Sequence, residues 1–161
     1  MPFVLTPERE RTLQEILARY PTKMAATLPL LHLCQEQAQY ISDDVIEFVA
    51  QRLEVSAAHV KGVVTFYTRY NQQPVGKHQI SVCRTLPCAL RGAYDLLAHC
   101  EKRLGIQSGE TTPDGQFTLR TVECLASCGT APVMQIDQQY HENLTPERVD
   151  SILAELARPK G

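Results

Sequence analysis

Residues 80–88 read ISVCRTLPC, an apolar run that leads directly into Cys83 and, after four intervening residues, into Cys88. A second run, residues 122–128, reads VECLASC and contains Cys124 and Cys128 with three residues between them. Four thiolate groups repel one another, so they gather in one place only around a cation. The two pairs therefore predict a metal ion or an iron–sulfur cluster held by two adjacent loops.

The residues around the two pairs alternate between strand-like and helix-like segments. We expect strands over residues 78–83, 117–123 and 133–136, a helix over residues 89–105 whose inner face includes Leu90, and a last helix from Thr145. This β-α-β-β-α order suits a small mixed sheet with helices packed on it, as in the thioredoxin fold.

The first 72 residues have a different pattern, with apolar residues at helical spacing. Thr6, Ser42 and Ser56 each stand before such a segment, as helix-capping residues do, and a further helix covers about residues 24–39 with an irregular first turn around Pro29. Short helices with brief connections indicate a helical bundle. We therefore expect an α+β chain, with a helical domain over residues 1–72 and a thioredoxin-like domain over residues 73–161.

Both cysteine pairs are expected where a strand passes into a loop. Cys83 and Cys124 each end a predicted strand, and Cys88 lies at a helix start, whose free N–H groups favour a thiolate. Spacing alone does not distinguish structural zinc from a 2Fe–2S cluster, because both use paired cysteines. The spacing differs from that of plant-type ferredoxins and from the C-x-x-C of dithiol oxidoreductases.

Composition narrows the classes of function. The 161 residues include 43% hydrophobic and 21% charged residues, as folded globular proteins do, and the net charge of -2 gives no indication of nucleic acid or a lipid surface as partner. No apolar stretch approaches the roughly 20 residues of a membrane span, and the first residues lack secretory-signal features. We therefore expect a reducing, cytoplasmic setting, where paired cysteines are more often metal ligands than disulfides.

Motifs from about residue 8 to residue 158 match one family in order. They are LHLCQEQ (31–37), GVVTFY (62–67), CRTLPC followed by LRG (83–92), ECLASC followed by AP (123–132) and YHENLT (140–145). The chain thus resembles the thioredoxin-like 2Fe–2S proteins typified by the E subunit of respiratory complex I, NADH:quinone oxidoreductase. The resemblance implies one 2Fe–2S cluster, with Cys83, Cys88, Cys124 and Cys128 as its ligands and metal-binding residues.

The resemblance also implies a role. In this family the cluster exchanges single electrons with the FMN of a partner flavoprotein, the F-type NADH-binding subunit of complex I, within a larger respiratory complex. We expect the chain to be peripheral on the cytoplasmic side of the membrane through that complex, with no membrane insertion of its own. The sequence has neither G-x-G-x-x-G after a strand nor G-x-x-x-x-G-K-S/T, so we expect no NADH binding and no catalytic site of its own.

Other interpretations stay open from the residues. The family also serves NAD-linked hydrogenases and formate dehydrogenases, where the role would be the same. A zinc-stabilised interaction module without redox chemistry is an alternative of another class. Cys34 and Cys100 lie on apolar faces of predicted helices, so we expect them to be packed in cores.

The chain departs from the family pattern beside the expected ligands. The family commonly has Gly-Ala between the last two cysteines, whereas this chain has Ala126-Ser127. We expect Ala126 to restrict the loop and Ser127 to donate a hydrogen bond toward a sulfur. Arg84 puts a positive charge beside Cys83. Both changes are expected to favour the reduced, more negative cluster and to raise its midpoint potential.

Overall fold

The computed structural model describes residues 2–158, and the chain divides into two compact units, Met1–Pro74 (unit 1) and Val75–Gly161 (unit 2). Each unit has a hydrophobic core of its own. Among the described residues, no helix is both long and apolar enough to cross a membrane.

Unit 1 is the predicted bundle of helices. It contains α1 (Pro7–Arg19), the short 3-10 helix η1 (Met24–Ala26), α2 (Thr27–Ala38), α3 (Asp43–Leu53) and α4 (Ala57–Phe66). The hydroxyl groups of Thr6, Ser42 and Ser56 each accept a hydrogen bond from the first turn of the helix that follows, which satisfies an N–H group with no partner inside the helix. The irregular turn expected before Pro29 is η1.

The core of unit 1 forms where the apolar faces of these helices meet. Its fully buried side chains include Leu13 of α1, Leu30 and Leu31 of α2, Val49 of α3 and Val60 of α4. Each such Val or Leu contributes about 1.5–3 kcal/mol through removal of apolar surface from water.

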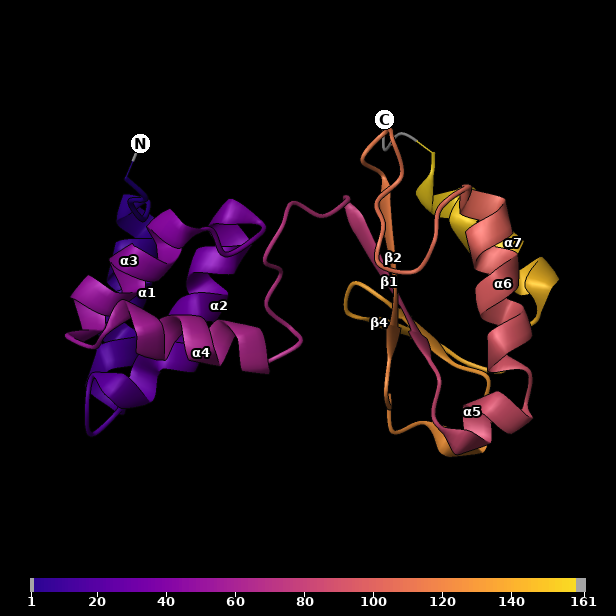
Figure 1. Ribbon diagram of the computed structural model, residues 1–161, viewed down its shortest axis with the longest axis horizontal. Coiled ribbons are helices and arrows are strands. Elements are labelled where there is room, and N and C mark those ends of the chain that lie inside the picture. Colours follow the sequence, from indigo (N-terminus) through magenta and orange to yellow (C-terminus); the bar gives the residue numbers. More distant parts are fainter. Residues whose placement is uncertain (1, 159–161) are drawn as a thin grey trace. The chain divides into compact units, whose positions relative to one another are not determined.

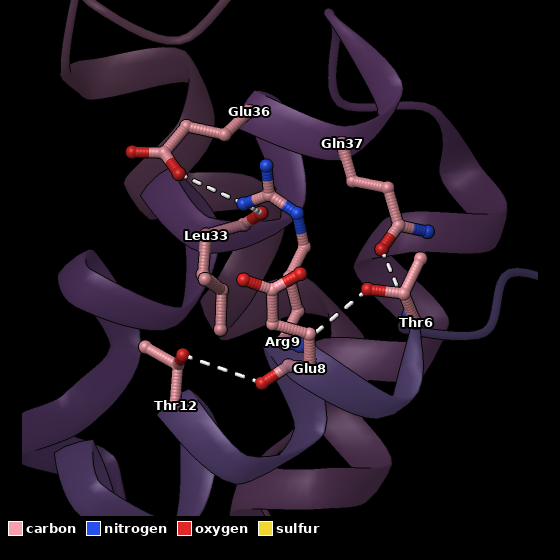
Figure 2. A network of polar contacts seen from close by, with 7 residues as sticks. All are labelled: Thr6, Glu8, Arg9, Thr12, Leu33, Glu36 and Gln37. Atoms are coloured by element: carbon pink, nitrogen blue, oxygen red, sulfur yellow. Dashed lines mark hydrogen bonds and ion pairs between the residues drawn. The ribbon is translucent and has the colours of Figure 1, made fainter.

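Hydrogen bonds join the start of α1 to α2 at the edge of this core (Figure 2). The Arg9 guanidinium donates to the Glu36 carboxylate at 2.8 Å and to the Leu33 carbonyl at 3.3 Å. The Gln37 side chain accepts from the Thr6 N–H at 3.0 Å. These contacts fix the start of α1 against the end of α2.

Unit 2 is built on a four-stranded mixed sheet of order β2-β1-β3-β4. The strands are β1 (His78–Cys83), β2 (Phe117–Val122), β3 (Met134–Ile136) and β4 (Gln139–His141). β1 pairs with β2 in parallel and with β3 in antiparallel orientation, and β3 pairs with β4 in antiparallel orientation. The parallel pair decides the position of the cysteines, because parallel strands end at the same edge of a sheet.

Helices cover one side of this sheet (Figure 1). Besides η2 (Cys128–Thr130), unit 2 has α5 (Leu86–Leu90), α6 (Ala93–Leu104) and α7 (Pro146–Leu156). Side chains of α6 and α7 pack with strands β1, β2 and β3 in one core, whose members include Leu96, Val149, Ile80, Leu119 and Met134. The α+β class and the thioredoxin-like arrangement are therefore confirmed.

Two details of unit 2 differ from the sequence-based expectation. The single helix expected over residues 89–105 is two helices, because the chain turns at Gly92 with φ of 88°. Leu90 consequently ends α5 with 78% of its surface exposed, and the expectation that it faces inward was wrong. The strand β4 was missed because it has three residues, of which Gln139 and Tyr140 are exposed.

Gly76 allows the chain to enter unit 2 against the backbone of β2. A Cβ atom at this position would lie 2.8 Å from the carbonyl carbon and 2.9 Å from the nitrogen of Phe117. The Gly76 N–H donates to the Thr118 hydroxyl at 2.6 Å in the interior. The backbone of β2 thus leaves no room for a side chain.

We expect Gly76→Ala to lower the free energy of unfolding of unit 2 by roughly 1–3 kcal/mol, the usual cost of overpacking a tight contact. Urea unfolding followed by circular dichroism measures the change. Gly62→Ala is the matched control, because nothing lies within 4 Å of its added Cβ in α4, and it should stabilise the protein by about 0.5–1 kcal/mol. A Gly76→Ala protein as stable as the parent would contradict the packing described.

Candidate metal centre

The fold brings both cysteine loops to one edge of the sheet. Cys83 is the last residue of β1, and it lies opposite Val122, the last residue of the parallel strand β2. Cys124 follows two residues after Val122, so both loops leave the same edge. In open sheets with parallel strands, ligands commonly bind beyond the carboxyl ends of the strands.

Backbone hydrogen bonds hold the start of the first loop in place. The Cys83 N–H donates to the Val133 carbonyl at 3.1 Å, and the Arg84 N–H donates to the Val122 carbonyl at 3.0 Å. The first cysteine is thus fixed between the two neighbouring strands, which leaves its position little freedom.

The cysteines of the first pair are interior and those of the second pair are accessible. Cys83 and Cys88 expose 2% and 1% of their surface, whereas Cys124 and Cys128 are exposed. Burial, followed by a hydrogen bond with Cys83 and the nearby thiols of Cys83 and Cys128, raises the pKa of Cys88 to about 11. Thiolates buried beside each other would be unstable without a bound cation.

Cys124, in the second loop, accepts a backbone hydrogen bond on its sulfur. The Ala126 N–H donates to Cys124 Sγ at 3.2 Å, within the turn that the second loop makes. Ala126 has φ of 56°, a left-handed conformation that is costly for a residue with a Cβ. The restriction expected of Ala126 is thus visible as a positive φ, which glycine would adopt without strain.

The residue set fits a cluster with two irons. Four cysteines arranged as two pairs supply the ligands of a 2Fe–2S cluster, in which each iron takes two of them. A structural zinc site instead needs four ligands around a single ion. The arrangement is compatible with a two-iron cluster that takes two ligands from each loop.

Arg84, the positive charge expected beside Cys83, forms an ion pair with Glu123. Its guanidinium donates to the Glu123 carboxylate, through Nε at 3.1 Å and also through Nη2. This contact raises the pKa of Arg84. Because Arg84 follows Cys83 and Glu123 precedes Cys124, the ion pair joins the two loops at the surface and neutralises the charge beside the first cysteine.

The Ser127 hydroxyl, which we expected to donate toward a sulfur, contacts two oxygen atoms in the structure. The Ser127 hydroxyl donates to the carboxylate of Glu142 and contacts the Thr130 hydroxyl at 2.7 Å. The N–H group that reaches a sulfur belongs to Ala126 instead. Sequence reasoning named Glu123 and Glu142 only as members of family motifs and missed their partners, which lie 39 and 15 residues away along the chain.

The remaining cysteines are parts of the cores. Cys34 in unit 1 and Cys100 in unit 2 are both fully buried. Burial, as the largest cause, raises the pKa of Cys34 to about 12 and that of Cys100 to about 11. Such thiols stay protonated and unreactive, in keeping with the predicted packing role.

Three large apolar side chains within or just after the first cysteine pair are exposed. Leu86 and Leu90 of α5 and Tyr94 of α6 expose 69%, 78% and 58% of their surface. Leu86 and Leu90 are four residues apart in one short helix, so they lie on the same face. We expected Leu90 to face inward because the sequence pattern predicts one continuous helix through Gly92.

Known proteins resemble this chain over most of its length. The family model Thioredoxin-like [2Fe-2S] ferredoxin matches residues 13–157. The E subunit of NADH-quinone oxidoreductase from Rickettsia bellii (strain RML369-C) is 44% identical over 146 residues, which cover 89% of this chain and 87% of the relative. The E 2 subunit of the same oxidoreductase from Rhizobium meliloti (strain 1021) is 45% identical over 136 residues, or 84% of this chain and 81% of the relative.

A solved structure has the same fold. An NAD+-reducing [NiFe]-hydrogenase in the air-oxidized state matches with a TM-score of 0.72 at 18% sequence identity. The match covers 81% of this chain and 22% of the hydrogenase chain, so this chain spans about a fifth of that protein. The family model decides the choice between zinc and iron–sulfur that cysteine spacing left open: the group to be held is one 2Fe–2S cluster.

We expect Arg84→Ala to lower the midpoint potential of the cluster by a few tens of millivolts. Without Arg84, the negative charge of Glu123 is no longer neutralised beside the first loop and disfavours the more negative reduced state. Glu123→Gln should shift the potential in the opposite direction, and the double variant should lie near the parent. Redox titration followed by EPR measures all four proteins, and an Arg84→Ala potential that does not fall would contradict the pairing.

Proposed function

Because the chain belongs to the thioredoxin-like [2Fe-2S] ferredoxin family and groups there with the E subunits of NADH-quinone oxidoreductases, we propose that it passes single electrons within such an oxidoreductase. When bound, the cluster supplies one-electron redox chemistry. The observation that carries the proposal is the placement of two cysteine pairs at the shared edge of β1 and β2, in a chain that matches the family model over residues 13–157.

The proposed ligands are Cys83, Cys88, Cys124 and Cys128. Because the first two cysteines are buried and the last two are exposed, we assign different roles to the two loops. Cys83 and Cys88 bind from the interior and keep water away from their sulfurs, since they are almost fully buried. Cys124 and Cys128 bind from the accessible loop, which makes that side of the site the one through which an electron donor is close enough to react.

The proposed donor is the FMN of a partner flavoprotein that binds and oxidises NADH, the F-type subunit of complex I. In this proposal the chain itself binds no NADH and acts as one component of a larger respiratory complex. That complex would hold it on the cytoplasmic side of the membrane as a peripheral subunit. The names of the relatives at 44% and 45% identity support the complex I assignment.

A second candidate is the same role in an NAD-linked hydrogenase or formate dehydrogenase. The likeness to an NAD+-reducing [NiFe]-hydrogenase supports it at the level of the fold, at 18% identity. The relatives with more than twice that identity are NADH-quinone oxidoreductase subunits, so we favour the complex I role.

Reduction by NADH tests the proposed function. We expect NADH alone to leave the purified, cluster-loaded chain oxidised, and NADH with the FMN-containing NADH-binding subunit of the same organism to reduce it. Optical absorption and EPR follow the reduction. A chain that NADH reduces without any flavoprotein, or that the flavoprotein fails to reduce while dithionite succeeds, would contradict the proposed partner.

Replacing a proposed ligand should remove the cluster while replacing a core cysteine should not. We expect Cys124→Ser to bleach the protein or to shift its EPR spectrum, because a hydroxyl is a poor substitute for a thiolate on iron. Cys34→Ser is the matched control, since Cys34 lies in the core of unit 1. Absorption spectra and iron content measure the effect. A Cys34→Ser protein that loses its cluster while Cys124→Ser keeps it would refute the ligand assignment.

A further inference from the structure

Glu142 contacts the second cysteine loop from outside it. Glu142 directly follows β4 (Gln139–His141), and one carboxylate oxygen, Oε1, accepts hydrogen bonds from two hydroxyl groups. One is the hydroxyl of Ser127, and the other is that of Thr130 at 2.7 Å. These two residues stand on either side of Cys128 and the following glycine. The carboxylate is therefore hydrogen-bonded to the loop on both sides of Cys128, a proposed ligand.

Backbone hydrogen bonds extend this contact. The Asn143 N–H donates to the Thr130 carbonyl at 2.7 Å, and the Leu144 N–H donates to the Pro132 carbonyl at 3.1 Å. Leu144 is itself packed in the core of unit 2. The segment after β4 thus runs beside the end of the cysteine loop and is anchored in the interior.

The cysteine loop needs such support. Ala126 adopts a positive φ, which is unfavourable for an alanine and persists only where the surroundings hold it. Within the same loop, the Ala126 N–H also donates to Cys124 Sγ. The two hydroxyl contacts also lower the pKa of Glu142, as expected when donors stabilise a carboxylate.

We infer that Glu142 is a positioning residue for the cluster: through Ser127 and Thr130 it holds the second loop in the conformation that presents Cys124 and Cys128 as ligands. The inference rests on the proposed assignment of these cysteines. Glu142 acts through the loop, as a hydrogen-bond acceptor shared by two side chains. Hydrogen bonds to a charged acceptor are stronger than neutral ones, which suits this carboxylate to the task.

A set of variants separates the acceptor role from charge and from general stability. Glu142→Ala removes the acceptor, whereas Glu142→Gln removes the charge but keeps an oxygen that both hydroxyls reach. Ser127→Ala removes one of the two donors. Glu155→Ala is the matched control, because Glu155 is an exposed glutamate of α7 with the same charge. Each variant is prepared as the full chain with its cluster, and circular dichroism checks the fold.

The rate of cluster loss to an iron chelator and the EPR line shape of the reduced protein are the two measurements. We expect Glu142→Ala to lose its cluster about tenfold faster than the parent, the factor that follows from losing hydrogen bonds to a charged acceptor, and to show a broadened spectrum. Glu142→Gln should lie closer to the parent than to Glu142→Ala in both properties, because its neutral oxygen still accepts both hydrogen bonds, although more weakly than a carboxylate. Ser127→Ala should fall between the two, and Glu155→Ala should match the parent.

Parental rates and line shapes in Glu142→Ala would overturn the inference, as would a Glu142→Gln protein no better than Glu142→Ala. If Glu142→Ala does not fold, Ser127→Ala decides: faster cluster loss supports the inference, and a parental rate overturns it. The Cys124→Ser protein separates the positioning role from the ligand assignment. If that protein keeps an unaltered cluster, the ligand assignment has failed and the inference falls with it. If Cys124→Ser loses the cluster while Glu142→Ala behaves as the parent, only the positioning role is refuted.

Discussion

The parallel pairing of β1 with β2 is the interaction on which the site depends. It sets Cys83 opposite Val122 and so brings the loop that begins at Cys83 beside the loop that begins after β2. The core of unit 2 fixes this register, because Ile80 and Leu119 are fully buried with side chains of α6 and α7. Slippage by one residue would turn Ile80 or Leu119 away from this core and would shift one loop along the edge of the sheet. The same β1–β2 register therefore buries the core of the sheet and brings the two cysteine loops together.

Charged side chains beside the two cysteine loops have partners within the protein. Arg84 and Glu123 neutralise each other at the surface, and the carboxylate of Glu142 is occupied by two hydroxyl groups. Exposed ion pairs contribute little to stability, so the value of the Arg84 contact lies in joining the loops and setting the local potential. The second loop, which includes a left-handed alanine, relies on the segment after β4 for its shape.

Much of this architecture could be predicted from the sequence, because its signals are local. Capping residues such as Ser42 and Ser56 marked helix starts, and the apolar runs before Cys83 and Cys124 marked strands. The errors arose where tertiary context decides. Gly92 interrupts an apparently continuous helix and leaves Leu90 exposed. The partners of Arg84 and Ser127 are 39 and 15 residues away along the chain, a distance over which spacing carries no signal.

The EPR spectrum of the anaerobically purified chain, with its spin count, before and after reduction by dithionite, tests the cluster most directly. A single 2Fe–2S cluster predicts a brown protein that is silent when oxidised and shows one spin-half signal per chain when reduced. A colourless protein that contains zinc in place of iron would contradict this assignment. An iron-loaded protein that stays silent on reduction, or one with a fraction of a spin spread over several signals, would contradict it equally.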